Sequence, residues 1–165
     1  MINLQSAKAQ DNLTIGYVDP QAILSKMPEM KAVQQRLQNF RDRKVQELQE
    51  KQSQFQQQLS AYQQKSTVIS EEAKKKEEER LGQLQSELQQ FQTQLQQEIQ
   101  QKQQELVGPL LQQIEEAINK VAEERGLTYV LNTTTSQGDV IILYASPSAR
   151  EQYDITDPVM QQLGI

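Results

Sequence analysis

The sequence contains no cysteine, no histidine and no tryptophan, and these absences exclude several kinds of site. Without cysteine there are no disulfides, no thiolate nucleophile and no cysteine-bound zinc. Without histidine there is neither a Ser-His-Asp nor a Cys-His catalytic arrangement, and the commonest transition-metal ligand is missing. The paired acids Glu115-Glu116 and Glu123-Glu124 lack a nearby Gly-rich loop or Asp-x-Asp spacing. We therefore expect no enzyme, no metal site and no cofactor.

Apolar residues are also scarce. They make up 36% of the chain, and aromatic residues 5%, against roughly 45–50% apolar residues in ordinary globular domains. The 165 residues suit one folding unit, but a large compact core is not expected. Glutamine alone accounts for 33 residues. The formal net charge of −5 disfavours nucleic acid as a partner, because nucleic-acid binding requires a basic patch.

No hydrophobic run is long enough to cross a membrane. The longest uninterrupted apolar run extends from Val140 to Ala145, whereas a membrane helix needs about 18 or more residues. Near the start, Ala7-Lys8-Ala9 precedes Gln10 and fits the small-x-small pattern of a signal-peptidase site. We expect residues 1–10 to be a tail that carries a signal-cleavage remnant; a chance match in an alanine-containing start is the alternative.

Proline and glycine are almost absent from the middle of the chain. From Glu29 to Val107 there is no proline and one glycine, Gly82, and good helix formers dominate. Leucine and phenylalanine recur at mixed steps of seven and eleven residues, which predict little supercoiling. Serine and β-branched residues weaken the helix at 66–70. We predict a helical hairpin arm over residues 29–106 with its tip near 66–70 and sides about 54 Å long; a single helix of about 75 residues is the alternative.

Strand signals lie outside this arm. Residues 13–18 alternate partly, residues 127–131 are β-branched and aromatic, and residues 140–144 are apolar throughout, as in a strand buried on both faces. A helix is expected from about Pro109 to Arg125, with the proline in its first turn. Three short strands cannot bury enough surface alone, and an exposed apolar strand pairs with other chains.

These elements predict an α+β fold in which a long antiparallel helical hairpin projects from a small three-stranded β body. The body is expected to comprise residues 11–28 and 107–165 and to assemble with other copies of the chain. The apolar and aromatic strand positions expected to form the oligomer body are Ile15, Tyr17, Val130, Val140, Ile142 and Tyr144.

Charge is divided unevenly between arm and body. Between Met30 and Leu106 there are 12 basic and 11 acidic residues, so the arm is nearly neutral and the acidity lies elsewhere. The cluster from Lys74 to Arg80 forms i,i+4 pairs typical of a solvated helix face; transient contact with an anionic membrane surface or with a client protein is the alternative. Nearly neutral arms of low apolarity predict weak contacts at many points. Individual client-binding residues are not predicted.

The segment Ile15-Gly16-Tyr17-Val18-Asp19-Pro20, continued by QAILSKMPE, resembles the opening of the OmpH/Skp family of periplasmic chaperones. The segment Asp154-Ile155-Thr156-Asp157 near the end is similar to the closing motif of that family. The resemblance covers about residues 12–164, and the order of its parts is its most specific feature.

This resemblance implies a homotrimer with a β-barrel-like body, three strands from each chain, and helical arms that enclose unfolded outer-membrane proteins in the periplasm. It implies no use of ATP and no enzymatic step. The expected function is that of an ATP-independent holdase chaperone; a structural coiled-coil spacer or adaptor of the cell envelope is the alternative. The well-known enterobacterial member is strongly basic, whereas these arms are nearly neutral, so its proposed lipopolysaccharide contact is not transferred to this chain.

Overall fold

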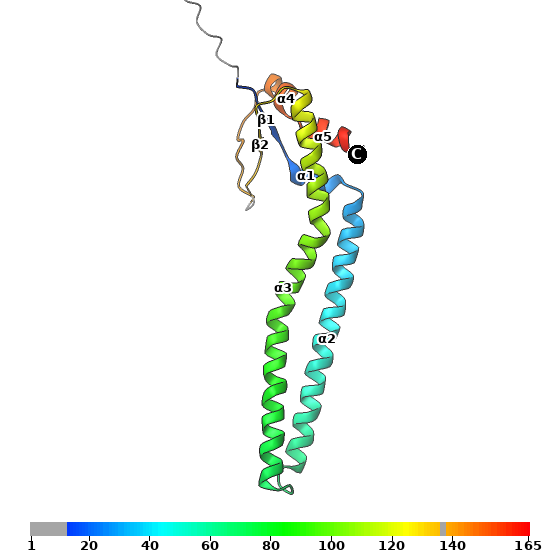
Figure 1. Ribbon diagram of the computed structural model, residues 1–165, viewed down its shortest axis with the longest axis vertical. Helices are drawn as coiled ribbons and strands as arrows, with labels where there is room; N and C mark the ends of the chain where they lie inside the picture. Colours follow the sequence, from blue (N-terminus) through cyan, green and yellow to red (C-terminus); the bar gives the residue numbers. More distant parts are fainter. Residues whose placement is uncertain (1–12, 136–137) are drawn as a thin grey trace, which may run out of the picture. The chain divides into compact units, whose positions relative to one another are not determined.

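The computed structural model describes residues 13–135 and 138–165, and the predicted tail over residues 1–10 lies outside them. The elements are, in chain order, β1 (Ile15–Val18), α1 (Pro20–Lys26), α2 (Glu29–Lys65), α3 (Glu71–Glu124), β2 (Tyr129–Asn132), α4 (Pro147–Tyr153) and α5 (Thr156–Leu163) (Figure 1). The chain divides into two compact units. The arm unit is Lys31–Val107, and the body unit comprises residues up to Met30 together with Gly108–Ile165.

The arm unit is an antiparallel pair formed by α2 and the first part of α3 (Figure 1). Two polar contacts join the helices. Lys44 Nζ lies 2.7 Å from Glu98 Oε2, and the Tyr62 hydroxyl donates a hydrogen bond to Glu78 Oε1 at 2.5 Å. The predicted long helix pair is therefore confirmed, and the alternative of one unbroken helix is excluded.

Residues 66–70 separate the two long helices, at the position where the sequence predicts the tip. Ser70 ends this turn, and its Oγ accepts a hydrogen bond from the Ala73 N–H at 3.3 Å. Glu71 and Glu72 follow in the first turn of α3, where acidic side chains stabilise the helix by attraction to the partial positive charge at its N-terminus. Ser70 is thus the N-cap of α3.

In the body unit, β1 and β2 form a two-stranded parallel sheet. Ile15 lies opposite Tyr129, and Val18 lies opposite Asn132. A Cβ at Gly16 would lie 2.6 Å from Leu127 Cδ1 and 3.2 Å from the Tyr153 carbonyl oxygen. The Leu127 side chain would therefore have to move to admit a larger residue at this position of β1.

The two segments that carry the family resemblance meet beside this sheet. The Asp19 carboxylate accepts a hydrogen bond from the Ala22 N–H at 2.9 Å and so caps α1. The backbone N–H of Asp19 donates to Thr156 Oγ1 at 3.0 Å, and the Ile155 N–H donates to the Tyr17 carbonyl at 2.9 Å. The chain's opening and closing motifs thus hold one another in place.

The core of the body unit is made by residues from α1, α3 and α5 together with β1. Its buried apolar side chains are Val18, Ile23, Leu24, Met27, Leu110, Ile114, Ala117, Val121, Ile155, Val159 and Met160. The amphipathic second part of α3 supplies four of them at helical spacing. This core is small, as the low apolar content predicts.

The prediction that a helix begins at Pro109 is wrong. The helix α3 continues through Pro109, which lies inside it. An interior proline removes one backbone hydrogen bond and costs about 3 kcal/mol. Leu110 and Ile114, both buried, lie immediately after it. Their burial offsets a cost of this size, since each large apolar side chain contributes about 1.5–3 kcal/mol.

The third predicted strand, over residues 140–144, does not form in the single chain. Val140 makes only an isolated antiparallel bridge to Thr134, and residues 141–146 have no strand assignment. A strand exists only where a neighbouring strand takes up its backbone hydrogen bonds. In the described residues the sheet consists of β1 and β2 alone, so a third strand stays a prediction for an assembled form.

Candidate functional site: a groove in the arm and an apolar segment in the body

Three of the six predicted oligomer residues lie in the sheet. Ile15 and Tyr17 belong to β1, and Val130, on β2, faces Gly16 in the register. Ile15 is exposed, whereas Tyr17 and Val130 are half-buried. Burial raises the pKa of the Tyr17 phenol, and the nearby Asp154 carboxylate adds to this increase. The sheet brings these three positions together on neighbouring strands.

The other three predicted residues, Val140, Ile142 and Tyr144, lie in the irregular segment 140–144. This segment is apolar but exposed: the exposed fraction is 89% for Leu143 and 79% for Tyr144. The segment is thus not buried in the single chain, and its burial in an assembled form stays a prediction. A run of exposed apolar residues is a common feature of protein–protein interaction sites.

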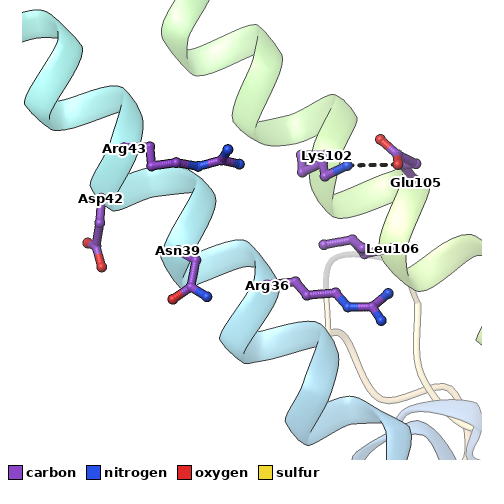
Figure 2. Close-up of a pocket in the computed structure, with 7 residues that line it drawn as sticks. All are labelled: Arg36, Asn39, Asp42, Arg43, Lys102, Glu105 and Leu106. Carbon is purple, nitrogen blue, oxygen red and sulfur yellow. Dashed lines mark hydrogen bonds and ion pairs between the residues drawn. The ribbon is translucent and has the colours of Figure 1, made fainter.

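A groove of about 720 Å³ lies in the arm unit between α2 and α3. Figure 2 shows the side chains of Arg36 and Arg43 extending from α2 toward α3. The other residues that line the groove are Asn39, Asp42, Lys102, Glu105 and Leu106. We call this set of seven residues the arm groove. Leu106 is its single apolar member.

The charges of the arm groove are unequally neutralised. Lys102 Nζ lies 2.7 Å from Glu105 Oε1 on its own helix, so these two charges offset one another (Figure 2). The Asp42 carboxylate accepts a hydrogen bond from Gln38 Nε2 at 2.8 Å. In the described part of the chain, neither Arg36 nor Arg43 forms an ion pair with a carboxylate. The groove therefore offers two guanidinium groups that lack an acidic partner.

Sequence reasoning missed the arm groove, although a signal for it exists. Residues 31–44 contain five basic residues and one acidic residue. Averaging the charge over the whole arm hides this segment, because the acidic residues of the arm are concentrated beyond it. The facing position of Lys102 and Leu106 on α3 depends on the pairing of the helices, which composition does not specify.

Beyond the groove, Lys44 connects the two helices. Its ammonium group pairs with Glu98 at 2.7 Å and with Glu47 at 3.4 Å. It also lies 5.9 Å from the ring centroid of Phe40 and 5.5 Å from that of Phe91, within the range of cation–π attraction. The hydrogen bond to Glu98 raises the pKa of Lys44 above 10.5, its ordinary value.

The contribution of Lys44 to arm stability is expected to depend on pH. Because its pKa is raised in the folded state, the stabilisation is complete below pH 10.5 and is lost as the pH rises through the folded pKa. Lys44→Met should lower the free energy of unfolding by about 1 kcal/mol or less at neutral pH. This difference should shrink above pH 10.5.

The measurement is urea unfolding of the helical signal at neutral pH and above pH 10.5, with Lys75→Met as the control. Lys75 is exposed on α3 and forms no ion pair among the described residues. An equal pH dependence of the two variants would contradict the role assigned to the Lys44–Glu98 pair.

A smaller hollow of about 250 Å³ lies near the tip of the arm unit. Its lining residues come from both helices and from the turn: Gln58, Ala61, Tyr62, Lys65, Ile69, Ala73, Glu77 and Arg80. Lys65 and Arg80 belong to the charged stretch around the tip, and Arg80 pairs with Glu77 at 3.8 Å. The lining of this hollow combines a few apolar side chains with charged ones. These residues do not form an arrangement of groups that is suited to catalysis.

Two general properties bear on the kind of site present. In residues 13–135 and 138–165, no group of three or more acidic side chains is placed to hold a metal ion. Over the same residues, no helix combines the length and the apolar content that spanning a membrane requires. Neither of the acidic pairs, Glu115-Glu116 and Glu123-Glu124, is part of such a group among the described residues.

Comparison with known proteins identifies the family. The family model described as outer membrane protein (OmpH-like) matches residues 14–163. A crystal structure of a candidate outer membrane chaperone (OmpH-like) from Caulobacter crescentus CB15 has a similar fold, with a TM-score of 0.70 at 18% identity. The alignment covers 98% of this chain and 90% of that chain. No curated protein matches this chain in sequence. The resemblance seen in the sequence is confirmed, and the chain belongs to the OmpH-like outer membrane protein family.

Proposed function

We propose that this protein is an ATP-independent holdase chaperone of the periplasm that encloses unfolded outer-membrane proteins between helical arms and prevents their aggregation. The observation that carries the proposal is the family match over residues 14–163, together with a similar fold in a protein described as a candidate outer membrane chaperone. The family supports a chaperone role and not an enzymatic one.

The composition of the arm supports a mechanism of many weak contacts. Most of the apolar side chains of α2 and α3 are half-buried along the seam between the helices, and Val33 and Leu81 are buried. The arm therefore lacks a large apolar face that would hold a client tightly. Several weak contacts made at the same time give a high effective affinity, and each breaks easily, so release requires no ATP.

We further propose that the chain acts as a homotrimer assembled through the body unit. Its support is the apolar segment 140–144, which is exposed in the single chain, and the small size of the body core. In the trimer, residues 140–144 pair as a third strand with the body of another copy. The oligomer residues Ile15, Tyr17, Val130, Val140, Ile142 and Tyr144 then lie at or beside the contact.

The proposed function predicts that this protein slows the aggregation of a denatured outer-membrane barrel at a near-stoichiometric ratio. The measurement is light scattering after the barrel protein is diluted out of denaturant, with and without this protein and without ATP. A soluble protein of the same mass is the control. No effect on scattering would favour a spacer or adaptor of the cell envelope instead.

A further inference from the structure

We propose that the arm groove binds acidic stretches of an unfolded polypeptide, with Arg36 and Arg43 each pairing with a carboxylate. This inference rests on the proposed chaperone function and specifies one class of client segment. It also assigns the binding of such segments to one surface of the arm unit, the arm groove. The occupant is a peptide chain that carries spaced Asp or Glu residues.

The first argument is the uncompensated charge of the groove. Two acidic residues line the groove: Glu105 pairs with Lys102, whereas Asp42 forms no ion pair in the described part of the chain and accepts a hydrogen bond from Gln38. The three basic and two acidic side chains of the lining leave a net charge of +1. Arg36 and Arg43 have no carboxylate partner in the described residues. A guanidinium group presents a planar set of N–H donors that matches a carboxylate, so these two side chains favour an anionic partner.

The second argument is the spacing of the two arginines. They are seven residues apart on α2, which is two turns and about 10.5 Å along the helix. An unfolded chain populates the polyproline II conformation, in which every third residue lies on the same face after about 9.3 Å. Acidic residues three positions apart in an unfolded client therefore match the two arginines, and the flexible arginine side chains cover the small difference.

The third argument separates a peptide from a lipid. Binding to the head groups of an anionic membrane surface typically uses a cluster of about four to eight basic residues with few acidic ones among them. The arm groove has one apolar lining residue, Leu106, and otherwise polar or charged ones, of which three are basic and two acidic. Its volume of about 720 Å³ suits a few residues of polypeptide. The lining is therefore better matched to an acidic peptide than to a membrane surface.

The test uses fluorescence anisotropy of a labelled, unstructured peptide of about twelve residues with Asp at every third position. A peptide with Asn in place of Asp is the uncharged control. The full-length protein is compared with the double variant Arg36→Gln/Arg43→Gln. We expect that variant to bind the Asp peptide about tenfold more weakly, since it loses two charge-assisted contacts. Binding of the Asn peptide should be weak and unaffected.

The charge-matched control is Lys31→Gln/Arg41→Gln. It removes two positive charges from the same part of α2, but neither residue lines the groove. We expect it to change the affinity for the Asp peptide by less than about twofold, through long-range screening alone. Glutamine is a good helix former, and all four positions are exposed, so circular dichroism should show unchanged helicity.

Three outcomes would overturn the inference. Equal weakening by both double variants would show that the overall charge of α2, and not the groove, attracts acidic segments. Binding of anionic phospholipid vesicles that depends on Arg36 and Arg43, without binding of the Asp peptide, would assign the groove to a membrane surface. If the wild type suppresses barrel aggregation but does not bind the Asp peptide, the groove inference alone fails. If it does not suppress aggregation, the proposed function fails whatever the peptide result.

Discussion

Leu143→Asp is expected to convert the assembled protein into single chains. Leu143 is 89% exposed in the single chain and belongs to the apolar segment 140–144. If this segment pairs with another copy, an aspartate in the contact must lose its hydration without gaining a partner. The cost of an unpaired buried charge is several kcal/mol, which is enough to dissociate a modest interface.

The measurement is molar mass by light scattering coupled to size exclusion at micromolar concentration. Val68→Asp is the matched control, because Val68 is 81% exposed but lies in the turn at the tip of the arm. We expect the wild type and Val68→Asp to have the mass of a trimer and Leu143→Asp that of one chain. A wild type that is monomeric at this concentration would contradict the proposed assembly.

Leu110→Ala is expected to destabilise the body unit by about 2–5 kcal/mol, the range observed for truncating a buried leucine. Leu110 has an exposed fraction of 6% and lies next to Leu111, which has 43%. The same substitution at these neighbouring positions of α3 therefore compares a core side chain with a half-exposed one. For Leu111→Ala we expect a loss well under half as large.

Urea unfolding followed by circular dichroism measures both variants. Both replace leucine by alanine, the best helix former, so helix propensity contributes little to the difference. An equal loss of unfolding free energy at the two positions would show that Leu111 is also buried in solution and belongs to the core.

The helical hairpin could be predicted because its signals are local. The absence of proline from Glu29 to Val107 permits long helices, and the serines and β-branched residues at 66–70 provide the turn. Ser70 caps α3 by a bond to a residue three positions away, which a single sequence can reveal. Each of these features depends on neighbours in the chain.

The incorrect prediction concerns a feature that depends on distant partners. Pro109 would end an isolated helix, yet α3 continues through it, and Leu110 and Ile114 are buried immediately after it. The strand at 140–144 also depends on a distant partner. Among the described residues only Val140 pairs, in one bridge to Thr134, so this strand stays a prediction for an assembled form.

The candidate site was missed for a related reason. Composition describes the arm as nearly neutral, but charge acts over distances of about 10 Å at moderate salt, not over a whole helix. Arg36 and Arg43 share a face of α2, and Lys102 approaches them only because the chain folds back on itself. The position of the turn determines which charges meet, and small errors in that position would change the pairing.

The parallel pairing of β1 with β2 has a consequence for the order in which a new chain folds. The bond between the Thr14 N–H and Thr128 Oγ1 spans a separation of 114 residues. At ordinary rates of synthesis, roughly 6–23 s pass before the second strand follows the first. The helices of the arm, whose contacts begin near the turn, can form during this interval, since helix formation is far faster. A chain that has been synthesised beyond Val107 but not yet through β2 therefore carries a finished arm and an unpaired first strand, and is itself a candidate for protection during its own biogenesis.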